Sequence, residues 1–232
     1  MSRQIVAFGG GAEPMRLGEA LEEWILRLTG RETPRICFLP TASGDSDANI
    51  VRFYQHFRHP RCQPSHLPLF RREGEDLRAR LLHQDIIYVG GGNTANMLAI
   101  WRLHGVDAIL REAWEAGILL CGGSAGSLCW YECGVTDSFG LQLAPLHDGL
   151  GLLPGSHCPH YDAEALRRPS YGRYVGEGVL PAGVAVDNAV ALRYEGKDLV
   201  EVVTAKAGAQ AYRVERTATG VHEAPLPARQ LR

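Results

Sequence analysis

The stretch ILLCGGSAG at residues 118–126 places a short apolar strand directly before a serine between glycines, with a helical segment after it. This strand-turn-helix order forces a serine out on a tight bend with its hydroxyl exposed. Gly122 and Gly126 suit such a bend, because the chain and its neighbours approach too closely there for side chains. The stretch therefore predicts an α/β fold with Ser124 at the carboxyl edge of a buried strand.

Similar apolar runs lie upstream of this stretch, at residues 5–8, 35–39 and 85–89, and alternate with segments of helical periodicity. That alternation is typical of a parallel sheet. After residue 184, short extended runs separated by turn residues predict antiparallel hairpins at the sheet's far edge. We expect an α/β fold with a mostly parallel central sheet, helices on both faces, antiparallel C-terminal hairpins and a single domain over residues 1–232.

Two of the expected helices can be assigned to particular residues. The first is indicated by apolar residues at helical spacing before Gly30, namely Leu17, Leu21, Trp24, Ile25 and Leu28. The second is predicted from Ala125 to about Cys133, so that Cys129 and Cys133 would be neighbours on one helix.

The composition limits the classes of function. The chain has 232 residues, of which 45% are hydrophobic and 22% charged, and a formal net charge of −2, so it has no electrostatic footprint for nucleic acid. No window of about 18 apolar residues could span a bilayer, and the first residues do not form a signal peptide. The six cysteines are spread through apolar segments, which indicates reduced thiols. We expect a cytoplasmic protein whose partners are small molecules or peptides, with no membrane and no nucleic acid.

The bend at Ser124 favours acyl chemistry, because the N-terminal amides of the following helix carry roughly half a positive charge. The N–H of Ala125 is one donor for an oxyanion, and Gly92, in the GGGN loop after the strand at 85–89, is our candidate for the second. The other interpretation of this loop is a plain turn or a phosphate cradle at a helix N-terminus.

A serine hydroxyl needs an imidazole as base and an acceptor to orient that imidazole. The downstream histidines are His147, His157, His160 and His222. His157 and His160 are both eligible, and position alone favours neither.

Two carboxylates are candidates for the orienting acid, Asp137 and Glu132. Eight residues of helix would place Glu132 about 12 Å along the axis from the serine, whereas Asp137 can approach a histidine more easily. A zinc set drawn from Cys129, Cys133, His157, Cys158 and His160 has none of the usual spacings, so we expect no metal.

Three motifs resemble the peptidase E family of serine peptidases, which includes aspartyl dipeptidases and, more distantly, cyanophycinases. They are VGGGNT at residues 89–94, the SAG turn at 124–126 and the Pro-His-Tyr segment at 159–161. The likeness covers nearly the whole chain. It implies a fold similar to class I glutamine amidotransferases, no cofactor and a homodimer.

Carried over to this sequence, the resemblance implies Ser124 as nucleophile, His160 as general base and then acid, and the amides of Gly92 and Ala125 as the oxyanion hole. It favours His160 over His157. The family's acid lies about two dozen residues before the histidine, which indicates Asp137, with Glu132 as the alternative.

Family aspartyl dipeptidases prefer an N-terminal Asp, whose carboxylate requires a cation. Arg167 and Arg168 lie where such an arginine is expected, Arg173 is a third candidate, and Asn93 is a further substrate-binding candidate. The leading hypothesis is a serine peptidase that hydrolyses short peptides through an acyl-enzyme on Ser124. The alternatives are an isopeptidase or other small-acyl hydrolase of the cyanophycinase type, and an anion-binding module without turnover.

Overall fold

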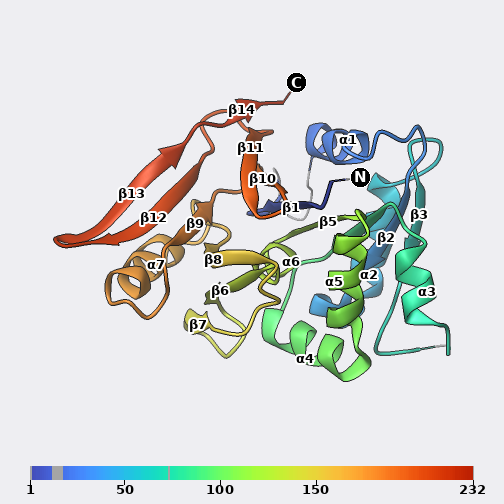
Figure 1. The fold of residues 1–232 in the computed structure, drawn as a ribbon, viewed down its shortest axis with the longest axis horizontal. Helices are drawn as coiled ribbons and strands as arrows, with labels where there is room; N and C mark the ends of the chain where they lie inside the picture. The colour runs from blue at the N-terminus through green and yellow to red at the C-terminus, as the bar shows by residue number, and fades with distance from the viewer. Residues whose placement is uncertain (1, 12–17, 73, 232) are drawn as a thin grey trace.

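The computed structural model describes residues 2–11, 18–72 and 74–231, and its strands form two sheets (Figure 1). The first sheet has, in spatial order, β14 (Arg229–Gln230), β11 (Asp198–Thr204), β10 (Val190–Glu195), β1 (Gln4–Phe8), β5 (Leu119–Gly123), β4 (Ile86–Val89), β2 (Arg35–Leu39) and β3 (Gln63–His66). The second has β13 (Gly220–Leu226), β12 (Ala211–Thr217), β9 (Gly183–Val186), β8 (Leu153–Cys158), β6 (Tyr131–Thr136) and β7 (Ala144–Leu146).

The centre of the first sheet is parallel, as the apolar runs predict. Strands β1, β5, β4, β2 and β3 pair in parallel, and β10 joins β1 in antiparallel orientation as part of a hairpin with β11. Alternate residues of β1 face opposite cores, with Ile5 on one face and Val6 on the other. The predicted parallel sheet with an antiparallel edge is therefore confirmed for this half of the fold.

Helices cover both faces of the first sheet. One face packs against α1 (Glu19–Arg27) and α2 (Asp47–His56), and the other against α3 (Leu77–Leu82), α4 (Thr94–His104) and α5 (Val106–Glu115). A 3₁₀ turn, η1 (Thr41–Ser43), follows β2. The first expected helix is present as α1, although Leu17 lies outside the described residues. None of the described helices has the length and apolar character that crossing a bilayer demands.

The second sheet differs from the prediction. The expected helix from Ala125 to Cys133 is wrong: α6 covers only Ala125–Leu128, and β6 begins at Tyr131. Cys133 pairs with Ser156 of β8 and so is not a helix neighbour of Cys129. Long-range pairing overrides the local preference here, because the backbone of β6 is satisfied by β7 and β8.

The second sheet is completed by α7 (Arg167–Gly176), which packs on it through Tyr171 and Val175. The β12–β13 hairpin belongs to this sheet and extends away from the first one (Figure 1). All six cysteines are free and buried. The two sheets are in contact, because one hydrophobic cluster contains residues of both, such as Leu120 and Val186.

Candidate active site

Ser124 occupies the bend between β5 and α6 with the backbone angles φ 56 and ψ −118. A non-glycine residue at such angles is strained and is held there by its surroundings. Its N–H donates to the carbonyl oxygen of Phe8 over 3.2 Å. A Cβ at Gly126 would lie 2.2 Å from the carbonyl oxygen of Val89, so only glycine allows α6 to pack this close to β4. The bend predicted from the sequence is therefore present.

Backbone amides surround Ser124. The N–H groups of Gly91, Gly92 and Ala125 donate to no backbone oxygen of the described residues. The loop after β4 passes directly beside the serine, since a Cβ at Gly91 would lie 3.2 Å from Ser124 Cβ. Gly92 lines two cavities together with Ser124, and Ala125 follows the serine in the chain, so both expected residues lie beside it, as does Gly91, which sequence reasoning did not single out.

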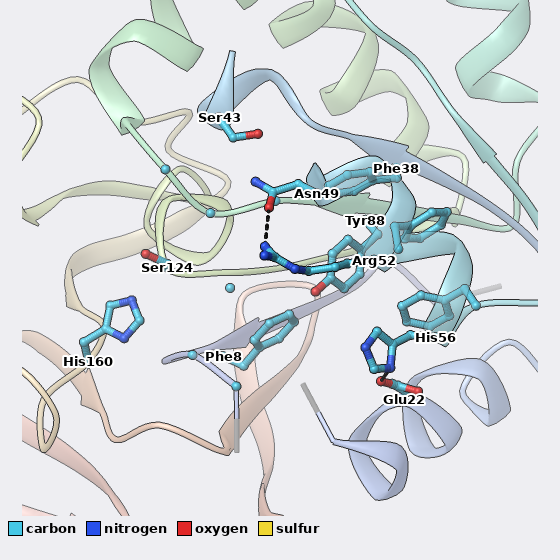
Figure 2. Close-up of a pocket in the computed structure, with 18 residues that line it drawn as sticks. Phe8, Glu22, Phe38, Ser43, Asn49, Arg52, His56, Tyr88, Ser124 and His160 are labelled. Atoms are coloured by element: carbon cyan, nitrogen blue, oxygen red, sulfur yellow. Dashed lines mark hydrogen bonds and ion pairs between the residues drawn. The ribbon is translucent and has the colours of Figure 1, made fainter. Parts of the chain in front are cut away.

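His160 lies in the loop after β8, and its Nδ1 is 2.8 Å from Asn188 Oδ1. An amide oxygen can only accept, so Nδ1 carries the proton and Nε2 is left as an acceptor. The N–H of Asn188 donates to Asp162 Oδ1 over 2.7 Å, which holds the asparagine in place. The backbone of Gly10 packs on this pair, because a Cβ there would lie 2.6 Å from His160 Cε1. Ser124 and His160 both face one of these cavities, which we name the larger cavity because the second one beside Ser124 is smaller (Figure 2).

The two carboxylates expected to orient the histidine make other contacts. Glu132 Oε2 accepts from the N–H of Gly155 over 2.8 Å, and Asp137 Oδ1 lies 3.8 Å from Arg167 Nη2. The hydrogen bond expected from one of them comes instead from Asn188, which sequence analysis missed. Strands β8 and β9 are parallel neighbours, so the residues just beyond them meet at one edge. The sequence alone does not show that these two strands pair, and for that reason Asn188 was not predicted as the partner of His160.

A smaller cavity of about 250 Å³ adjoins Ser124. Its lining residues are Gly92, Asn93, Ser124, Asp137, Glu164 and Arg167. The Arg167 side chain is buried and donates to Glu164 Oε2 over 2.6 Å and to the carbonyl oxygen of Val135 over 2.9 Å. This cavity therefore contains one of the expected arginines together with two carboxylates.

The remaining substrate-binding candidates are engaged elsewhere. The Arg168 guanidinium lies 5.0 Å from the Tyr212 ring centre and is ion-paired with Glu223. Arg173 lies over the ring of Tyr174. Asn93 lines the smaller cavity, but its side chain caps α4 and donates to the carbonyl oxygen of Ser138 over 2.9 Å. Among the three candidate arginines, only Arg167 lines a cavity at Ser124.

Comparison with known proteins places the chain in a family. The sequence pattern of peptidase family S51 matches residues 5–202. The chain belongs to peptidase family S51.

Relatives of this S51 peptidase agree with that assignment. A Bacillus subtilis protein named "Uncharacterized peptidase YgaJ" is 48% identical over 232 residues, which cover 99% of each chain. Peptidase E of Shewanella denitrificans is 36% identical over 90 residues, or 38% of each chain. The crystal structure of a peptidase from an acI-B1 actinobacterium has the same fold, with a TM-score of 0.68 at 19% identity over 98% of this chain and 95% of that one. The likeness to class I glutamine amidotransferases stays a prediction.

His157 lies in the core of the S51 peptidase, away from both cavities. Its Nδ1 donates to the carbonyl oxygen of Val184 over 2.9 Å, and its Nε2 lies 2.9 Å from Ser127 Oγ. Its ring is stacked on Tyr131 at a centroid distance of 4.4 Å. Burial lowers the pKa of His157 to about 3, so the imidazole is neutral near pH 7.

The larger cavity has a volume of about 430 Å³. Residues from β1, α1, β2, α2, β4 and the glycine-rich loop line it, with Ser124 and His160 at one end (Figure 2). Across residues 2–11, 18–72 and 74–231, no three His, Cys, Asp or Glu side chains are grouped so that they could hold a metal ion.

Proposed function

We propose that this S51 peptidase hydrolyses short peptides through an acyl-enzyme on Ser124. His160 Nε2 takes the hydroxyl proton as Ser124 Oγ attacks the peptide carbonyl, and then gives that proton to the leaving amine. In the second half, His160 takes a proton from the water that attacks the ester, and returns it to Ser124 Oγ as the acid is released. The observation that carries this proposal is the strained bend of Ser124 facing the same cavity as His160, whose Nδ1 is bound by Asn188.

Asn188 is a positioning residue in this proposal. By accepting from Nδ1 it keeps the proton off Nε2, which must be free to act as base. A neutral asparagine fills the same position in papain-like proteases, where it orients a histidine beside a cysteine. The amides of Gly91, Gly92 and Ala125 supply donors for the oxyanion of the tetrahedral intermediate.

The smaller cavity is proposed to bind the N-terminal residue of the substrate. Asp137 and Glu164 can accept hydrogen bonds from an α-ammonium group, while Arg167 offers a cation for an aspartate side chain. A preference for N-terminal Asp is proposed on Arg167 alone, whose Nε already donates to Glu164, so the acidic side chain would compete with that carboxylate. Two carboxylates around one arginine can also bind the α-ammonium group of a substrate whose N-terminal residue is not acidic. Peptides with N-terminal Ala are therefore the matched comparison for peptides with N-terminal Asp.

The test measures hydrolysis of Asp-Leu, Ala-Leu and Asp-p-nitroanilide by the wild type and by Ser124→Ala, with a chelator present. Removing the nucleophile should lower kcat/KM by about 10³-fold or more. Equal rates in the two proteins would contradict the serine mechanism. A fluorophosphonate should label the wild type at Ser124, whereas an anion-binding module with an unactivated serine would stay unlabelled. Faster hydrolysis of β-aspartyl-arginine than of Asp-Leu would favour the isopeptidase alternative.

A further inference from the structure

Much of the wall of the larger cavity is aromatic, and Asn49 and Arg52 are among the polar residues that also line it (Figure 2). Five rings line it: those of Phe8, Phe38 and Tyr88 come from three strands, that of Phe53 from α2, and that of Phe57 from the residue that follows α2. The Tyr88 ring stands at their centre, with its centroid 5.9 Å from that of Phe8, 5.7 Å from Phe38 and 5.5 Å from Phe57. Rings at such separations hold one another in place. The rings therefore form a packed aromatic wall, of which Figure 2 labels Phe8, Phe38 and Tyr88.

These rings are anchored in the core on their far side. Phe38, Phe53 and Phe57 belong to the buried cluster between the first sheet and its two N-terminal helices. Water against such apolar walls is unfavourable, and an apolar occupant would displace it. A cavity of about 430 Å³ is large enough for a phenylalanine or leucine side chain. The walls thus favour a bulky apolar group.

The charged groups opposite Ser124 do not favour a basic side chain. Glu22 and His56 line the cavity on the side away from the serine (Figure 2). The Glu22 carboxylate lies 3.0 Å from His56 Nδ1 and 3.6 Å from Arg61 Nη1, although its buried Oε1 makes no hydrogen bond within the described residues. A lysine or arginine side chain would lose its hydration along the aromatic walls and would meet the cation of Arg52, which lines the cavity, and that of Arg61, which already faces Glu22.

Ser124 lines both cavities, so a peptide attacked by its hydroxyl extends into one on each side. The carboxylates of the smaller cavity suit the amino-terminal residue, which leaves the aromatic cavity for the residue beyond the scissile bond. We propose that the aromatic cavity binds a bulky apolar side chain on the residue that leaves, so that the preferred substrates are dipeptides with Leu or Phe in second position. This inference rests on the proposed function and assigns the leaving-group side of the same site.

The first test compares dipeptides that differ only in the second residue. Asp-Ala, Asp-Leu, Asp-Phe and Asp-Lys, and the same four with N-terminal Ala, are given to the wild type. We expect kcat/KM to be at least about tenfold higher for Leu and Phe than for Ala or Lys. If the wild type hydrolyses all of these peptides with equal kcat/KM and Ser124→Ala hydrolyses none of them, this inference is overturned while the proposed function stands. Complete inertness of every peptide would overturn the proposed function as well.

The second test fills the cavity. Asn49 of α2 lines it, whereas Val51 on the same helix is 56% exposed and does not. Asn49→Trp should lower the ratio of kcat/KM for Asp-Phe to that for Asp-Ala at least about fivefold, because the indole occupies space that the substrate ring needs. Val51→Trp adds the same ring toward solvent and should keep the wild-type ratio.

An unchanged ratio in a folded Asn49→Trp protein would contradict the assignment, and circular dichroism establishes whether that variant is folded. If Asn49→Trp does not fold, the ratio of kcat/KM for Asp-Phe to that for Asp-Ala is measured in Asn49→Leu, which adds less volume. The wild-type dipeptide series then tests the assignment independently of any variant.

Discussion

Two histidines three residues apart at the end of β8 have opposite environments. His157 is fully buried, stacked on Tyr131 and neutral, and both of its nitrogens have partners inside the core. His160 is beyond the strand, where Nδ1 is bound by Asn188 and the ring faces the larger cavity. The same side chain is thus a packing element in one place and, in the proposed mechanism, a proton carrier in the other. The difference comes from burial and from Nε2, which has a partner in His157 and is free to act as an acceptor in His160.

The largest expected effect separates these two histidines directly. His160→Ala should lower kcat/KM by about 10³-fold or more with little change in the free energy of unfolding, because only the base is lost. His157→Ala should instead lower the free energy of unfolding by about 2–4 kcal/mol, since it leaves a cavity and removes the buried hydrogen bonds of the imidazole with Ser127 and Val184. Peptide hydrolysis and urea unfolding of both variants provide the measurement. A folded His157→Ala without activity, beside an active His160→Ala, would reverse the assignment.

The next effect concerns the partner of His160. Asn188→Ala should reduce kcat/KM about 10- to 100-fold, because the imidazole loses the acceptor that sets its tautomer. Asn188→Asp keeps an acceptor and should retain most of the activity. Glu132→Gln is the matched control, since Glu132 contacts the backbone of Gly155 and not the histidine. A larger loss from Glu132→Gln than from Asn188→Ala would restore Glu132 as the orienting residue.

The smallest effect is the pH dependence that His157 alone contributes. Its pKa is lowered to about 3 in the folded protein by burial, against about 6.5 in an unfolded chain. Between these values the unfolded state binds more protons, so stability is lost as pH falls through this window. At pH 5.5 this group should make the free energy of unfolding about 1 kcal/mol lower than at pH 7.5.

Urea unfolding of the wild type and of His157→Gln at the two pH values isolates that contribution from the titration of carboxylates. The variant should lose about 1 kcal/mol less than the wild type on acidification. Equal losses in the two proteins would show that His157 is not held neutral by the fold.

The second sheet shows why part of the site was beyond sequence analysis. Its strands β6 (YECGVT) and β8 (LPGSHC) contain glycines, a proline and charged or polar residues without regular alternation. Their pairing depends on partners more than 20 residues away along the chain, such as Gly134 with His157. Periodicity does not contain that information. The role of Asn188 was hidden for the same reason, since Asp187 and Asn188 alone predict only a turn between extended runs.

The amino-acid sequence by itself determined the parallel core of the first sheet and the bend at Ser124. Buried parallel strands require continuous apolar runs, and a backbone that packs as closely as Gly126 on Val89 requires glycine, so both features are local. Only the tertiary structure decided that Asn188 meets His160, that His157 is buried, and that aromatic residues from four separate segments of the chain line one cavity. These are consequences of long-range packing, in which each side chain acquires its chemistry from neighbours that the chain brings together only on folding.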